Sequence, residues 1–172
     1  MRDDQAGTIE WPDGGFPGIR VNPESLLPEI ISEETCAAAL EASTDPAEQV
    51  LVLLVEGRAG DAAEVLAEAR YRDPESFRLR VYEADVLRVS HRYDRAVELF
   101  RQLLTEAHGT ANEALAHQYL GRAYFAAGNI GAAVESFARA LDLRVAQSAD
   151  AALIYSSTVA LQRARDVFEL AS

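Results

Sequence analysis

Apolar residues recur along the middle of this chain with the spacing of packed helices. Between residues 43 and 147 they return every three or four positions, which is the period of one face of an α-helix. One triplet of apolar positions returns after 34 residues and again after a further 37: Ala62, Leu66 and Ala69; Ala96, Phe100 and Leu103; Ala133, Phe137 and Ala140. A repeat of this length predicts stacked helical hairpins, each of which buries its apolar face only against its neighbours.

Capping residues predict where the helices begin. Asp45 followed by Pro46 combines an N-cap with proline at the first helical position, and Asp73 followed by Pro74 repeats the arrangement in the next unit. Thr110, three residues before a glutamate, predicts a capping box for the first helix of the third unit. Helix starts and apolar spacing therefore favour the same alternation of helices and short turns.

The third unit has the most specific pattern. In spacing, it resembles the tetratricopeptide repeat through six residues: Leu120, Gly121, Tyr124, Ala133, Phe137 and Ala140. The small residues allow helices to approach closely, and the large ones fill the space between them. The first two units match less well, since the large aromatic residue of the family's fourth position is replaced by Pro46, Arg80 and His117 in the three units.

The resemblance implies an all-α fold. We expect a right-handed α-α superhelix of about three helical hairpins, in units 43–76, 77–110 and 114–147. Residues 148–172 then form one final helix, which either caps the stack or associates with a second copy of the chain.

The N-terminal segment, residues 1–42, differs in composition. Trp11 and Phe16 stand among prolines and glycines, which indicates an irregular arm that is either a flexible leader or docked on apolar surface of the stack. A short helix is expected from about Glu33 to Ala42, with Ser32 as its cap.

Charge and composition narrow the classes of function. The net charge is -12, and residues 1–69 carry all of it, with 15 acidic residues against three arginines. This acidic balance argues against binding to nucleic acid, which needs a basic surface. The longest apolar run, Val50 to Val55, is too short to span a membrane. One cysteine and a first segment, residues 1–4, without an apolar leader predict a cytoplasmic protein.

The resemblance to tetratricopeptide repeats implies that four positions of each first helix line a concave groove. In the first unit these are Thr44, Ala47, Leu51 and Leu54. In the two later units, the predicted partner-binding residues are Arg78, Val81, Asp85, Arg88, Leu115, Gln118, Arg122 and Phe125. The arginines could hold an acidic peptide, or they could pair internally with Asp85, Glu83 or Asp94. The lysines and asparagines with which the family clamps chaperone tails are absent from these positions.

Catalytic motifs are lacking. The spacing of His91, His108 and His117 matches no zinc site, and no nucleotide-binding glycine pattern occurs. We therefore expect no enzyme, cofactor or metal, but a protein–protein interaction module that binds a partner peptide or helix in its groove. The alternative is a self-occupied or self-associating stack, with the arm in the groove or a homodimer through the last helix.

Overall fold

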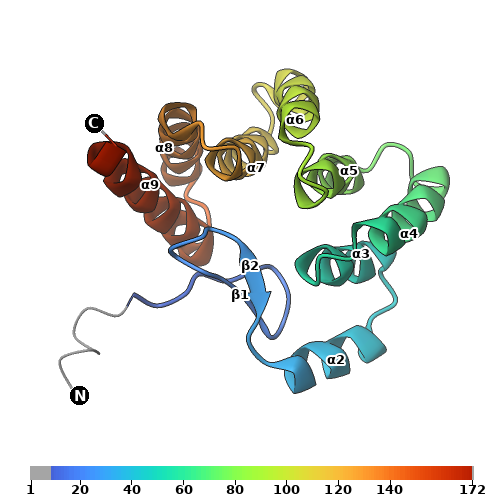
Figure 1. Ribbon diagram of the computed structural model, residues 1–172. Coiled ribbons are helices and arrows are strands. Elements are labelled where there is room, and N and C mark those ends of the chain that lie inside the picture. Colours follow the sequence, from blue (N-terminus) through green and yellow to red (C-terminus); the bar gives the residue numbers. More distant parts are fainter. Residues whose placement is uncertain (1–8, 172) are drawn as a thin grey trace, which may run out of the picture.

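The structure, a computed structural model, describes residues 9–171 (Figure 1). This part of the chain is all-α apart from one short two-stranded sheet, so the all-α part of the predicted fold class is confirmed. The prediction about residues 1–4 lies outside the described residues. The elements in chain order are β1 (Ile19–Val21), β2 (Pro28–Ile30), α2 (Glu33–Ala42), α3 (Pro46–Val55), α4 (Ala59–Arg72), α5 (Phe77–Val89), α6 (Tyr93–Ala107), α7 (Glu113–Ala126), α8 (Ile130–Ala146) and α9 (Ala151–Ala171).

The helices follow a curved path. Figure 1 shows α3, α5 and α7 on the inner side of the curve and α4, α6 and α8 on the outer side. From α3 to α9 each helix packs against the next one, and α5 also contacts α3 and α7. The inner helices therefore present a common surface toward the centre of the curve.

The start of α3 follows the sequence prediction. A carboxylate oxygen of Asp45 accepts the backbone N–H of Ala47 at 2.9 Å, and Pro46 occupies the first turn. The corresponding prediction for α5 is wrong. The N-cap is Ser76, whose hydroxyl oxygen accepts the N–H of Leu79. Because α4 continues to Arg72, Asp73 serves as its C-cap instead.

The predicted capping box before α7 is also wrong. The Thr110 hydroxyl donates to the carbonyl of Ala107 at 2.7 Å, and Glu113 accepts the N–H of Gly109 at 2.9 Å. Both side chains thus stabilise the turn that leaves α6. The helix itself begins at Glu113, after Asn112.

Close approach between α7 and α8 depends on Gly121. A Cβ atom at this position would lie 2.6 Å from the ring of Phe137, well inside contact distance. Phe137 is fully buried, as is Phe100 in the preceding pair of helices. The small and large residues of the repeat pattern therefore meet in the core, as their sizes require.

The N-terminal arm, residues 9–32, contains a hairpin that the sequence did not predict. Strands β1 and β2 pair antiparallel, with Ile19 opposite Ile30. Figure 1 places this hairpin between α3 and α9, so that it spans the opening of the curve. Strands of three residues are too short to produce a visible alternation of apolar and polar positions.

The two flanking helices lie as expected along the sequence. Helix α2 has the predicted bounds and the predicted cap, since Ser32 accepts the N–H of Thr35. Helix α9 packs against α8. None of the described helices combines the length and the apolar character that crossing a membrane requires.

Candidate functional site

A cavity lies at the centre of the curve. It is bounded by the inner helices α3, α5 and α7, by α9 and by the N-terminal arm, and its volume is about 180 Å³. Residues as distant in sequence as Pro12 and Ala160 line it. We call it the central cavity.

The structure brings five of the eight predicted partner-binding residues to this cavity: Asp85, Arg88, Leu115, Gln118 and Arg122. Leu51 and Leu54, which the same repeat positions supply from the first unit, line it as well. The inner faces of three helices therefore contribute to one cavity.

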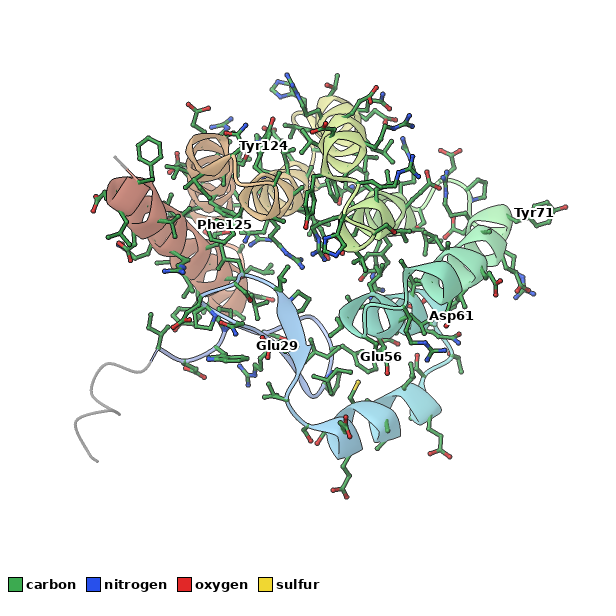
Figure 2. The ribbon with its side chains drawn as sticks, viewed as in Figure 1. Glu29, Glu56, Asp61, Tyr71, Tyr124 and Phe125 are labelled. Atoms are coloured by element: carbon green, nitrogen blue, oxygen red, sulfur yellow. The ribbon has the colours of Figure 1, made fainter. Side chains whose placement is uncertain are left out.

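The other three predicted residues lie elsewhere. Val81 is 1% exposed and belongs to the hydrophobic core. Phe125, labelled in Figure 2, is half-buried and packs with a cluster that includes residues of α9. Arg78 is half-exposed at the start of α5, with 42% of its side chain accessible.

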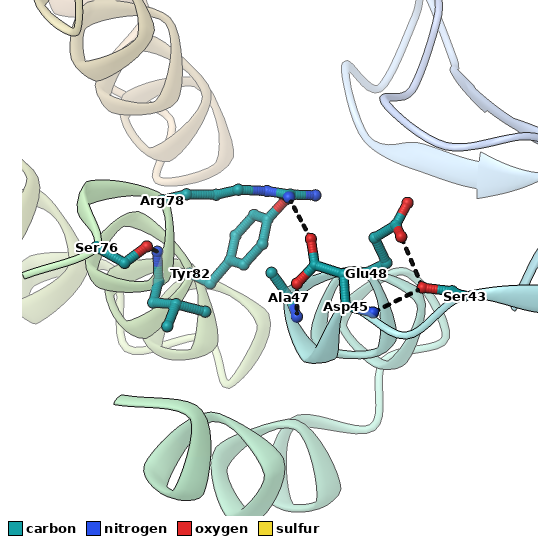
Figure 3. Close-up of polar contacts among 8 residues, drawn as sticks. Ser43, Asp45, Ala47, Glu48, Ser76, Arg78 and Tyr82 are labelled. Carbon is teal, nitrogen blue, oxygen red and sulfur yellow. Dashed lines mark hydrogen bonds and ion pairs between the residues drawn. The ribbon is translucent and has the colours of Figure 1, made fainter. Parts of the chain in front are cut away.

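Arg78 joins two helices (Figure 3). Its Nη1 donates to Asp45 Oδ2 at 3.1 Å, and its Nε donates to the hydroxyl of Tyr82 at 3.1 Å. The guanidinium also lies over the Tyr82 ring. Because Asp45 caps α3, Arg78 connects the first turn of α5 to that cap, and its donors face protein groups.

Asp85 and Arg88 form a buried ion pair at the wall of the cavity. Arg88 donates two hydrogen bonds to the carboxylate, at 2.6 and 3.1 Å, and both side chains are buried. Burial by itself would raise the pKa of Asp85, but the charge and hydrogen bonds of Arg88 outweigh it and lower the pKa. The carboxylate is thus ionised, and two nitrogen atoms of Arg88, Nε and Nη2, donate to it.

Arg122 is held differently. Its guanidinium lies 4.9 Å from the centre of the Tyr119 ring, in cation–π contact. Its Nε and Nη2 atoms are buried and make no hydrogen bond with any described residue. Two strong donors at the cavity are therefore unused.

Arg144, near the end of α8, also lines the cavity, and sequence reasoning missed it. Its Nη1 donates to the carbonyl of Leu153 at 3.0 Å and to the hydroxyl of Ser157 at 2.9 Å. Ser157 in turn donates to Gln118. Burial lowers the pKa of Arg144, as expected for a cation that lacks a carboxylate partner.

A signal for Arg144 was present in the sequence. The residue continues the apolar stripe of Ala133, Phe137 and Ala140 by one further turn, where a charged side chain is exceptional. The repeat resemblance assigns the groove to first helices only, and Arg144 stands on a second helix.

The arm closes the cavity through apolar contacts. Phe16 and Ile19 are buried in the core cluster that includes α3, whereas Leu26 is buried in the cluster that includes α8 and α9. Tyr155 and Arg163 of α9 donate to backbone carbonyls of the arm, at 2.7 and 2.8 Å. The arm thus contacts both ends of the row of helices.

The histidines lie away from the central cavity. His91 contacts the hydroxyl of Tyr93 at 2.7 Å. His108 and His117 approach the carboxylate of Glu113, at 3.7 and 3.5 Å. Within residues 9–171, no three potential metal ligands of the His, Cys, Asp and Glu type come together.

Comparison of the chain with protein-family models, with curated proteins and with solved structures gave no match. The resemblance to the tetratricopeptide repeat therefore depends on the residues of the repeat pattern and stays a prediction.

Proposed function

We propose that the chain is a non-enzymatic interaction module, built as a right-handed stack of three tetratricopeptide-type hairpins whose concave groove is occupied by its own N-terminal arm. The observation that carries the proposal is the position of the arm. Three of its apolar side chains, Phe16, Ile19 and Leu26, are at most 6% exposed against the helices. A partner peptide reaches the groove by replacing the arm.

The manner in which the arm is held supports replacement. In the described chain, the hydrogen bonds between its backbone and other backbone groups stay within the arm or run to the start of α2, and none of them joins it to α3 through α9. The contact is made by spaced apolar side chains and by two side-chain donors that α9 offers to carbonyl oxygens. A peptide with similarly spaced apolar residues offers the same groups.

The exposed groove would favour an acidic peptide. Leu51 and Leu54 supply an apolar region, and Arg122 supplies donors that have no partner among residues 9–171. A hydrogen bond to a charged group contributes about 1.5–3 kcal/mol. Together with one apolar anchor, two such bonds give an affinity in the micromolar range, about 8 kcal/mol in total.

A displayed library of random peptides tests this function whichever partner the chain binds. Phe16→Ser combined with Leu26→Ser loosens the arm, and the control Leu27→Ser changes a residue that is 38% exposed. We expect the loosened variant to select peptides that bind the unsubstituted chain and the Leu27→Ser control at least about tenfold more weakly, since the arm competes.

Circular dichroism must show that the loosened variant keeps its helices. Arg122→Glu in that background should then abolish capture of the selected peptides. If a folded, loosened variant selects no peptide, the interaction function is wrong and the arm is a permanent structural element.

A second candidate is a homodimer through α9. Near its C-terminal end, α9 carries two exposed large apolar side chains, Phe168 and Leu170, at 50 and 84%. Exposed apolar surface of this kind marks association sites. Light scattering after gel filtration should show a dimer that Phe168→Ser with Leu170→Ser converts to a monomer; a monomer in the unsubstituted chain would exclude this candidate.

A further inference from the structure

The central cavity has more positive than negative charge. Arg88, Arg122 and Arg144 line it, against two carboxylates, Asp13 and Asp85. Arg88 already binds Asp85, and Asp13 is exposed on the arm, where it accepts a backbone N–H. Among the ion pairs of residues 9–171, none includes Arg122 or Arg144.

These two arginines offer donors to the cavity. Within residues 9–171, Nε and Nη2 of Arg122 are buried without a hydrogen-bond partner, and the guanidinium lies over the Tyr119 ring. In the described part of the chain, Arg144 donates only to neutral oxygens, those of Leu153 and Ser157. Arg144 is buried and Arg122 is partly buried. Removing a cation from water without an ion-pair partner is unfavourable, so an anion in the cavity would stabilise both side chains.

Tyr119 interacts electrostatically with all three arginines of the cavity. The Tyr119 side chain is partly buried in the core, and its electrostatic neighbours include Arg88 and Arg122, while Arg144 is influenced by the same phenol. Burial is the main reason that the pKa of Tyr119 is raised, so its hydroxyl keeps its proton. It is therefore a further donor near the guanidinium groups and not a competing anion.

The size of the cavity and its remaining walls restrict the ligand. The volume is about 180 Å³. A cavity of roughly 150 Å³ holds a benzene molecule, so this one holds a compound with a single ring or a short chain. Leu51, Leu54, Leu115 and Val159 form an apolar wall. A ligand that fits both features has one anionic end and one apolar end.

We propose that the central cavity binds a small organic carboxylate, whose anionic group is held by Arg122 and Arg144 and whose apolar body lies against the leucines of α3 and α7. A guanidinium fork matches the planar geometry of a carboxylate. The inference depends on the arm-closed groove of the proposed function but not on a peptide partner. The ligand would sit between the arm and the helices and add contacts to the closed form.

Water is the alternative content of the cavity. Ordered water molecules can satisfy the donors of Arg122, but they add no negative charge to a cavity in which neither Arg122 nor Arg144 has an ion-pair partner among residues 9–171. The two alternatives differ in their response to ligand charge. Neutral molecules of the same shape should not bind if the guanidinium groups attract an anion.

Isothermal titration calorimetry on the full chain tests the proposal with benzoate, hexanoate and inorganic phosphate, and with benzamide as the neutral isostere of benzoate. We expect benzoate or hexanoate to bind with a dissociation constant below about 1 mM and benzamide to bind at least tenfold more weakly. Absence of carboxylate binding at about 10 mM, or equal binding of benzamide, overturns the proposal. Binding of phosphate without either carboxylate overturns the assignment to a carboxylate.

Arg122→Gln locates the site and should weaken carboxylate binding roughly tenfold or more. Arg101→Gln, at an exposed position on α6, is the matched control and should have no effect. Unchanged affinity in a folded Arg122→Gln variant contradicts the site. No peptide enters the titration, so its failure leaves the peptide proposal untouched, and a failed peptide selection leaves this titration to be judged by itself.

Discussion

Arg88 binds both carboxylate oxygens of Asp85, one turn earlier on the same helix, and both side chains are buried. Because Arg88 neutralises Asp85, these two residues together add no net charge to the cavity. Their neighbour Arg122 also lowers the pKa of Asp85, although by less. Because Asp85 pairs with Arg88, the other cavity arginines, Arg122 and Arg144, are the ones that could bind an anion.

Breaking this pair should destabilise the protein strongly. Arg88→Met leaves Asp85 buried without its partner, and we expect a loss of about 3–5 kcal/mol in the free energy of unfolding at pH 7. Urea denaturation measures it. The double variant Arg88→Met with Asp85→Leu should recover most of that loss, because the unpaired charge is gone. Equal instability of the single and double variants would show that the pair acts through packing.

Stability should fall in two steps as the pH is lowered. Burial is the main reason that the pKa of His117 is lowered, so its contribution is present above the unfolded-state value of about 6.5 and is lost as the pH falls below it. The pKa of Glu113 is lowered chiefly by the N–H of Gly109, and the pKa of Asp85 is also lowered. Their contributions are present above about 4.5 and are lost as the pH falls further.

Urea denaturation at pH 7, 5.5, 4.5 and 3.5 follows both steps. His117→Gln should remove the first step and leave the second one. A variant that keeps the full decrease between pH 7 and 5.5 would assign that decrease to another group.

The contact of Gly121 with Phe137 should tolerate no added methyl group. Gly121→Ala places a Cβ atom 2.6 Å from the ring, so we expect a destabilisation of about 1–3 kcal/mol. The control is Gly60→Ala in α4, where a Cβ would meet nothing within 4 Å and should stabilise the helix by about 0.5–1 kcal/mol. Thermal unfolding of both variants checks that Gly121→Ala destabilises the protein and Gly60→Ala stabilises it. Adding Phe137→Leu to Gly121→Ala should relieve the clash and recover part of the lost stability.

Gly18 should control the docking of the arm. It has a φ of +82°, and a Cβ atom there would lie 2.6 Å from the carbonyl oxygen of Ser32. Gly18→Ala should therefore undock the arm and raise both dye binding and hydrogen exchange in α3 and α9. Gly57→Ala has a similar φ of +77° but no atom within 4 Å, so it isolates backbone strain from the clash. Equal effects of the two variants would contradict a special role for Gly18.

The sequence predicted the helices well because their signals are local. Apolar spacing and the Asp45 cap depend on neighbours within one or two turns. The start of α5 was mistaken because two capping candidates, Asp73 and Ser76, lie three residues apart, and the end of α4 decided between them. Such competition is visible only when both helices are placed.

The site was harder to predict because its parts come from distant segments. The repeat pattern brought Arg88, Arg122 and Gln118 into consideration, since they share positions on first helices. The hairpin of the arm and Arg144 follow from no repeat position. Their roles depend on how the two ends of the row of helices meet, which a periodic pattern does not encode.

The N-terminal arm, which contacts both α3 and α9, should make the unfolding of the two ends of the row of helices cooperative. A row of helices with free ends frays from those ends and can gain or lose a unit with little disturbance elsewhere. Here Phe16 and Leu26 attach a single short segment to both ends. Fraying at either end then requires release of the arm, so the two ends should open together. The arm has a fixed span, so it also sets how many helices the curve can contain.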